Sequence, residues 1–129
     1  MLLVKTKIGQ SNISGIGVFA DEFIPKGTVI WRYQEGFDQM IDKSELEKLS
    51  APAKKQFLNY AYLDLKTQKY ILAFDDSRFF NHSEIPNCDE ADIPGEMVTA
   101  TIAGRDIAIG EEITDDYREY DASFADRNI

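Results

Sequence analysis

The sequence predicts a mainly β fold of short strands interrupted by one helical insertion. Short apolar stretches recur along the chain and are separated by glycine, proline and asparagine turns, a pattern typical of small sheets. Signals that start helices gather in the middle of the chain, near Ser44 and Ser50. Strand and helix signals do not alternate, which argues against a doubly wound nucleotide-binding fold.

The expected strands follow one another through polar turns. Leu2–Ile8 alternates in part between apolar and polar residues and predicts the first strand. A turn rich in serine, asparagine and glycine follows at 9–17, and a second turn lies at 25–27. Further strands are expected at 17–20, 28–33, 70–74, 97–103 and 113–114.

The helical insertion is expected at about 42–62. Ser44 and Glu47 have the spacing of a capping box, S-x-x-E, which predicts a helix start. Ser50 followed by Pro52 marks a second start. Three apolar residues then share one helical face, namely Ala53, Phe57 and Ala61.

The length and composition correspond to one globular domain. The chain has 129 residues, of which 43% are hydrophobic and 29% charged, and it can build a core without disulfides. Cys88 is the single cysteine, so no internal disulfide or cysteine-rich zinc site can form, and we expect no metal. Met1–Lys5 lacks the apolar stretch of a signal peptide, and no apolar run is long enough to span a membrane. We therefore expect a cytoplasmic protein without a membrane partner.

The net charge is negative and unevenly distributed. The total of −9 divides into +2 over residues 1–74 and −11 over residues 75–129. An acidic half repels phosphate backbones, so we expect no direct nucleic-acid partner. It attracts a basic, lysine-containing protein or peptide. Alternatively, the acidity serves only solubility. A domain of this size is expected to be a monomer or a homodimer.

Three short motifs carry the candidate chemistry, and each alone allows a purely structural interpretation. Gly15-Ile16-Gly17 is either a tight turn or a backbone that lets a ligand approach closely. The run R-F-F-N-H-S at 78–83 holds the single histidine, which is either a structural residue or a general base. No second histidine supports a hydrolase triad. The acidic run at 110–117 has no EF-hand spacing and by itself indicates a solvated edge.

In this order, the motifs G-x-G-V-F-A, R-F-F-N-H-S-x-x-P-N-C and G-E-E-I-T-x-D-Y resemble those of the SET-domain protein lysine methyltransferases. The resemblance runs from about Val4 to Tyr120 and is to a minimal SET domain, of the compact kind found in bacteria and viruses. It implies the β-clip fold of small curled sheets with a helical insertion. It also implies a C-terminal pseudoknot between 78–83 and 112–117. The SET domain would occupy 1–120, and a short segment at 121–129 would complete the cofactor and lysine site.

The resemblance also implies a cofactor, S-adenosylmethionine, and a catalytic residue, Tyr117, whose hydroxyl would lie near the transferring methyl group. The G-x-G turn would approach the cofactor through its backbone, and the N-H-S motif would hold its amino-acid end. The implied cofactor-binding residues are Ser14, Gly15, Ile16, Gly17, Arg78, Phe79, Asn81, His82, Tyr117 and Phe124. Many members of the family bind zinc through a cysteine cluster after the domain, which this chain lacks, so Cys88 is expected to be a free thiol.

The resemblance implies an aromatic channel for the substrate lysine. Tyr33, Tyr60 and Tyr62 are the candidates for its walls; the alternative for each is an ordinary core or surface aromatic. The family usually has Y-x-G at Tyr33, where this chain is one residue longer. Asp115 stands where the family usually has tyrosine or phenylalanine, a position tied to the number of methyl groups added. Strand alternation places Asp115 on the same face as Tyr117, which favours the channel over the solvent.

Three functions are compatible with these features. The first is transfer of a methyl group from S-adenosylmethionine to the ε-amine of a lysine in a basic protein. The second is a SET-fold module without catalysis that binds a basic peptide or partner. The third is an acidic, chaperone-like or nucleic-acid-mimicking surface. The presence of Asn81, His82 and Tyr117 favours the first.

Overall fold

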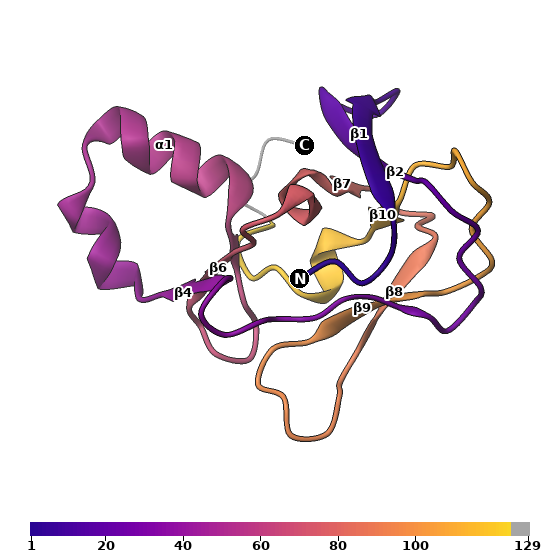
Figure 1. The fold of residues 1–129 in the computed structure, drawn as a ribbon. Coiled ribbons are helices and arrows are strands. Elements are labelled where there is room, and N and C mark those ends of the chain that lie inside the picture. Colours follow the sequence, from indigo (N-terminus) through magenta and orange to yellow (C-terminus); the bar gives the residue numbers. More distant parts are fainter. Residues whose placement is uncertain (125–129) are drawn as a thin grey trace.

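The computed structural model describes residues 1–124, and over that range the chain forms short strands, one α-helix and three 3₁₀ helices (Figure 1). The strands are β1 (Thr6–Gln10), β2 (Ile16–Ala20), β3 (Val29–Trp31), β4 (Gln39–Ile41), β5 (Tyr62–Leu63), β6 (Tyr70–Leu72), β7 (Asn81–His82), β8 (Cys88–Ala91), β9 (Ala100–Ala103) and β10 (Thr114–Asp115). The helices are η1 (Lys43–Lys48), α1 (Ala51–Tyr60), η2 (Asp76–Phe79) and η3 (Tyr117–Glu119). The predicted mainly β fold is confirmed. No helix within residues 1–124 is long and apolar enough to cross a membrane.

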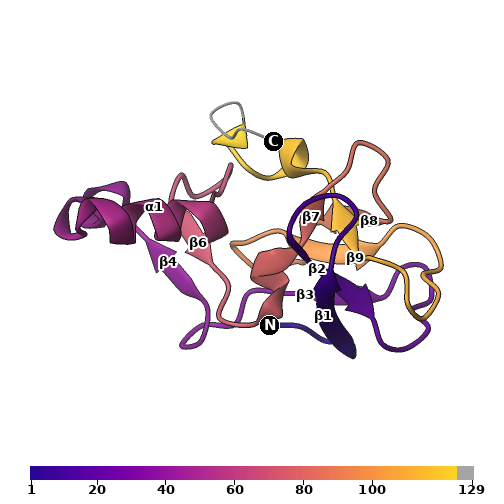
Figure 2. The same cartoon turned by 90° about the horizontal axis from the view of Figure 1, so that it is seen from above.

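The strands form small separate sheets. β1 and β2 make an antiparallel hairpin, and two three-stranded antiparallel sheets have the orders β3-β9-β8 and β4-β6-β5. Both views show α1, β4 and β6 on one side of the molecule and the β1–β2 hairpin with β8 and β9 on the other (Figures 1 and 2). The short helices η2 and η3 lie between these halves, so residues from both halves can meet there.

The helical insertion lies where it was predicted, but only one of its two predicted starts is correct. The Ser50 hydroxyl accepts a hydrogen bond from the backbone N–H of Ala53 at 3.3 Å and caps α1. The capping box expected at Ser44 is wrong, because η1 begins at Lys43 after Asp42 and has no side-chain cap. This segment buries only Leu46 and remains a 3₁₀ helix.

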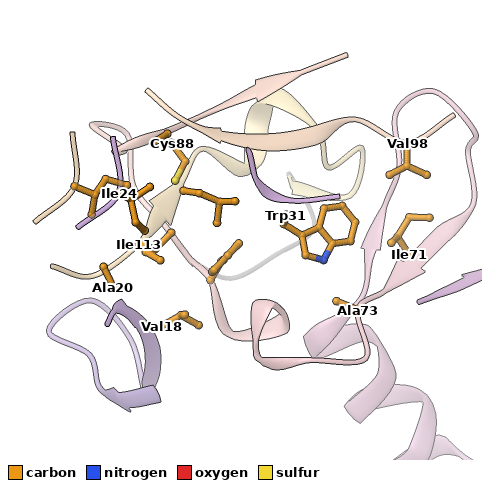
Figure 3. Packing of buried hydrophobic residues seen from close by; sticks show 13 residues of the cluster. Val18, Ala20, Ile24, Trp31, Ile71, Ala73, Cys88, Val98 and Ile113 are labelled. Carbon is orange, nitrogen blue, oxygen red and sulfur yellow. The ribbon is translucent and has the colours of Figure 1, made fainter. Parts of the chain in front are cut away.

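The apolar core connects the small sheets. Its fully buried members include Val18, Ile30, Ile71, Ile107 and Ile113, which come from strands and loops across the whole chain. In Figure 3 the Trp31 indole lies between a group containing Cys88 and Ile113 and the pair Ile71 and Val98. Trp31 therefore packs where the two halves of the molecule meet.

Two segments far apart in the sequence lie side by side as parallel strands. In the β7–β10 pair, Thr114 is opposite Asn81 and Asp115 is opposite His82. The buried Asn87 side chain supports this pair by donating to the Glu112 carbonyl oxygen at 2.8 Å and accepting from the Thr114 N–H at 2.9 Å. The expected adjacency of 78–83 and 112–117 is thereby confirmed.

Candidate active site

A cavity of about 60 Å³ opens between the two halves of the molecule. That volume accommodates a few water molecules or one thin side chain. Its walls draw residues from α1, from η2 and η3, and from the strands β3, β5, β8, β9 and β10. Six of the lining residues are aromatic, namely Trp31, Tyr60, Tyr62, Phe80, Tyr117 and Tyr120.

The aromatic walls are joined by edge contacts between rings. The Tyr62 and Tyr120 ring centroids are 4.8 Å apart at an interplanar angle of 82°, and the Tyr117 and Tyr120 centroids are 5.9 Å apart. The His82 ring lies 5.2 Å from that of Tyr117 and 4.9 Å from that of Phe124. Such T-shaped and tilted pairs are favourable geometries. They connect the cavity to the N-H-S motif.

Tyr117 is held through its backbone N–H and through its hydroxyl. Its backbone N–H donates to His82 Nδ1 at 3.1 Å, so the proton of a neutral His82 is on Nε2. Its hydroxyl donates a short hydrogen bond to the Phe80 carbonyl oxygen. Asp116 begins the 3₁₀ helix by accepting from the Arg118 N–H at 3.0 Å, and the Arg118 guanidinium holds the pKa of Asp116 below its usual value. The phenol is therefore positioned by backbone groups at the edge of the cavity.

Asn81 connects the N-H-S motif to the G-x-G turn. Its side-chain amide nitrogen donates to the carbonyl oxygens of Ser14 at 3.1 Å and Ile16 at 3.2 Å, and to a carboxylate oxygen of Glu112 at 2.8 Å. A Cβ at Gly17 would lie 2.4 Å from the same carboxylate, which explains the glycine. The Asn81 amide thus fixes the conformation of the turn, and the backbone of the turn can contact a ligand.

Three carboxyl groups line the cavity, those of Glu90, Asp115 and Asp121. Asp115 is 2% exposed and accepts a hydrogen bond from the Tyr120 hydroxyl at 3.1 Å. Burial, with the nearby Asp116 charge, raises the pKa of Asp115 to about 7. Burial, with the Asp115 charge, raises the pKa of Glu90 to about 9. Asp115 and Glu90 hold protons more tightly than exposed acids because their charged forms are poorly solvated.

Two further polar atoms in the cavity walls lack partners. The Oε1 oxygen of Glu90 and the Nε1 nitrogen of Trp31 are buried and have no hydrogen-bond partner among the described residues. In Figure 3 the indole nitrogen lies on the edge of the ring nearer to Ala73, another residue of the cavity wall. Buried polar groups normally have partners, so the cavity is suited to a polar guest.

Five of the fourteen residues expected at the site line the cavity, whereas the G-x-G turn, Asn81 and His82 lie outside its wall. Arg78, Tyr60, Tyr62, Asp115 and Tyr117 line the cavity, and the expectation that Asp115 faces away from solvent agrees with its burial. Outside the wall, Phe79 packs against Tyr60 at 5.6 Å and Phe124 packs against His82. Of the expected C-terminal segment, 125–129 lies outside the described residues.

Tyr33 is a correction, because it lies outside the cavity. β3 ends at Trp31, and it is the Trp31 side chain that lines the cavity. The Tyr33 hydroxyl instead donates to the Asp38 carbonyl oxygen at 3.1 Å, in the loop that follows β3.

Ten of the fifteen lining residues were not anticipated from the sequence, and Trp31, Glu90 and Tyr120 are among them. The sequence could have indicated Tyr120, because it follows Tyr117 by three residues and such residues lie on the same side of a 3₁₀ turn. Glu90 had no such local signal, because its place in the wall depends on the pairing of β8 with β9, in which it lies opposite Thr101.

Comparison with known proteins agrees with this arrangement. The sequence matches the SET domain family over residues 15–118, from the G-x-G turn to η3. No curated protein matches the sequence. Among solved structures, the fold is similar to the crystal structure of a candidate histone methyltransferase from Plasmodium falciparum, with a TM-score of 0.61 and 25% identity over 90% of this chain and 95% of that one. This chain therefore belongs to the SET-domain family.

Proposed function

We propose that this chain transfers a methyl group from S-adenosylmethionine to the ε-amine of a lysine in a basic protein. The observation that carries the proposal is the position of Tyr117, which touches both the N-H-S motif and the aromatic cavity. Its ring lies 5.2 Å from that of His82, while its hydroxyl is directed to the Phe80 carbonyl oxygen in the cavity wall. A phenol in this position can orient a cofactor bound near the N-H-S motif and a lysine side chain that enters the cavity.

The residues around the N-H-S motif fit the cofactor. A Cβ at Gly15 would meet no atom within 4 Å, so this turn presents open backbone, while Asn81 holds the carbonyl groups on either side of it. Those fixed carbonyl oxygens suit the ammonium end of a methionyl group, and the Arg78 guanidinium in the cavity wall suits its carboxylate. When bound, S-adenosylmethionine supplies a methyl group attached to a positively charged sulfur.

The cavity residues prepare the lysine for attack. The aromatic walls remove water from the ammonium group, which lowers the pKa of the amine and favours its nucleophilic neutral form. A narrow channel also aligns the nitrogen for in-line attack, since the side chain has few other orientations there. Tyr117, held by Phe80 and His82, orients the reacting groups without moving during the reaction.

The substrate is proposed to be a basic segment of a protein, approached along an acidic surface. A second cavity of about 260 Å³ shares Glu90, Thr99 and Tyr120 with the first. Its other acidic residues are Asp64, Asp92 and Glu119. Lysine and arginine side chains beside the target lysine would find complementary charge here.

The experiment combines binding and transfer. Calorimetry of the purified chain with S-adenosylmethionine should give one site, and incubation with lysine-rich proteins should add methyl groups that mass spectrometry assigns to lysine. Cofactor binding without transfer to any basic protein would favour the non-catalytic SET-fold module. Absence of cofactor binding would overturn the proposal.

A further inference from the structure

The second cavity contains a basic side chain of the protein itself. Lys66 lies in the turn between β5 and β6, and its ammonium group donates a short hydrogen bond to the carboxylate of Asp92, which follows β8. The two residues are 26 positions apart in the sequence, and both line the cavity of about 260 Å³. Among the residues that the structure describes, Lys66 is the only base in this wall. The ion pair therefore joins two walls of the cavity that the proposed substrate approaches.

The turn that carries Lys66 is held by other residues. The Asp64 carboxylate accepts hydrogen bonds from the backbone N–H and from the hydroxyl of Thr67, at 2.8 Å each. The Leu65 N–H donates to the Tyr120 carbonyl oxygen at 3.3 Å and connects the turn to the opposite wall. The Lys66 side chain is 44% exposed, and exposed ion pairs contribute little to folding. The turn therefore keeps its shape when the Lys66 ammonium changes its partner.

The other acidic side chains of this cavity are not neutralised by a base. Asp64, Glu90 and Glu119 line the cavity, and within the described part of the chain no lysine or arginine forms an ion pair with any of them. The Oε1 oxygen of Glu90 is also buried there without a hydrogen-bond partner. Lys66 occupies a single carboxylate, that of Asp92. The cavity therefore offers a cation more acceptors than Lys66 uses.

We propose that Lys66 occupies the place of a substrate arginine, and that an arginine beside the target lysine displaces Lys66 from Asp92 when the substrate binds. The inference rests on the proposed function, in which the substrate is a basic protein segment. A lysine ammonium has three donors on one nitrogen, whereas a guanidinium has five donors in a planar fork and can bind two carboxylates at once. Arginine therefore competes successfully with Lys66, and a neutral flanking residue does not. Lys66 thus determines which basic segments bind tightly.

The alternative is that Lys66 and Asp92 form a brace between β5 and β8 that keeps the cavity open for any substrate. The two interpretations differ in the sign of one effect. Loss of a brace weakens the binding of a basic peptide, whereas loss of an internal competitor strengthens it. Removal of the Lys66 charge therefore decides between them.

The test measures the binding of labelled heptapeptides to the intact chain without cofactor, by fluorescence anisotropy at low salt. One peptide has a central lysine flanked on both sides by arginine, and two others carry lysine or glutamine in place of the arginines. The arginine peptide should bind the wild type at least about twofold more tightly than the lysine peptide, because of its additional donors. Equal binding of these two peptides would overturn the proposal.

Lys66→Met keeps the length of the side chain and removes its charge. It should bind the arginine peptide about two- to fivefold more tightly than the wild type, the range expected when a substrate no longer competes with one exposed ion pair. Lys69→Met is the matched control, because Lys69 is 43% exposed in the same turn, pairs with Asp42 at 3.5 Å and lies outside the cavity wall. Its affinity should change by less than about twofold. Equal gains in both variants, or no gain in Lys66→Met, would overturn the proposal.

The glutamine peptide tests what Lys66 competes with. Lys66→Met should bind it no more tightly than the wild type does, because this peptide has no flanking cation to take the place of the Lys66 ammonium. An equal gain for the glutamine and arginine peptides would mean that Lys66 affects only the central lysine, and would overturn the proposal.

Binding and transfer also separate this inference from the proposed function. Tighter arginine-peptide binding by Lys66→Met without methyl transfer by any variant would support the competition and reject the enzyme. Methyl transfer with the same peptide affinity in the wild type and in Lys66→Met would support the enzyme and reject the competition. When both hold, Lys66→Met should lower KM for the arginine peptide more than it changes kcat, because the competition acts on substrate binding.

Discussion

The side-chain amide of Asn81 donates a hydrogen bond to the carboxylate of Glu112 at 2.8 Å. The same carboxylate accepts from the Ser11 hydroxyl at 2.8 Å, so the hairpin turn, β7 and the segment before β10 meet at one cluster. Two of the three motifs on which the resemblance rests meet in this contact, and the G-x-G motif joins it through the Ile16 carbonyl oxygen, which accepts from Asn81 at 3.2 Å. The cluster is therefore the structural link between the proposed cofactor site and the fold.

Tyr117→Phe should lose most methyl transfer and keep cofactor binding. The hydroxyl is proposed to act on the reacting groups, and removal of one positioned polar group at a reaction centre typically costs on the order of 10²-fold in rate. Mass spectrometry of the product and calorimetry with S-adenosylmethionine measure the two effects. Tyr33→Phe is the control, since it removes a hydroxyl outside the cavity and should retain the wild-type rate. Unchanged turnover in Tyr117→Phe would reject its catalytic role.

Asn81→Ala should weaken cofactor binding and also lower the free energy of unfolding. It removes donors from two carbonyl oxygens and one carboxylate, and each partner left unsatisfied costs about 1–3 kcal/mol where it is buried. Urea unfolding and calorimetry provide the measurements, with Asn12→Ala in the exposed turn as control. The cluster has no structural importance if both variants unfold at the same urea concentration.

Gly17→Ala should destabilise the fold through Glu112. The new Cβ would lie 2.4 Å from the Glu112 carboxylate, which would have to abandon its bonds to Ser11 and Asn81. We expect a loss of about 1–3 kcal/mol in the wild-type background. In a Glu112→Ala background the same substitution should cost clearly less, because the obstructing side chain is absent. Equal costs in a double-mutant cycle would contradict this explanation.

The free energy of unfolding should decrease as pH rises from about 4 to about 9. The pKa values of Asp115 and Glu90 are raised in the folded chain to about 7 and about 9, so over this range the native state binds more protons than the unfolded state. Each group contributes a slope of at most about −1.4 kcal/mol per pH unit. Thermal unfolding across this range should show a flatter profile for Asp115→Asn and for Glu90→Gln. Asp89→Asn should follow the wild type, and parallel profiles for all four proteins would contradict the raised pKa values.

Methylation of a basic peptide should become less efficient as salt rises. Residues 75–129 carry a charge of −11, and the proposed approach to the cavity passes the exposed acids Asp92 and Glu119. Raising ionic strength from about 0.01 M to about 1 M shortens the Debye length from about 30 Å to about 3 Å, which screens exposed charges. The effect should appear in KM more than in kcat. A peptide whose flanking basic residues are replaced by glutamine should show little salt dependence; the same dependence for both peptides would argue against electrostatic recruitment.

Local features of the sequence were sufficient to predict most elements and the central motifs. The strands at β2, β3 and β6 lie within one or two residues of their predicted positions, because alternation and turn residues act over short distances. The Ser50 cap is equally local. Asp115 and Tyr117 both line the cavity, but strand alternation is not the reason, because β10 ends at Asp115 and Tyr117 begins η3.

Contacts between distant segments decided which side chains complete the site. Trp31 rather than Tyr33 lines the cavity, because β3 pairs with β9 and the chain leaves the sheet after Trp31. Glu90 was placed there by the pairing of β8 and β9. The Asn81 side-chain amide donates to acceptors 31, 65 and 67 positions away in the sequence, on Glu112, Ile16 and Ser14, and not to a ligand as expected. Hydrogen-bond partners and cavity walls are set by which surfaces pack together, and a local pattern of polar and apolar residues carries no information about such distant pairs.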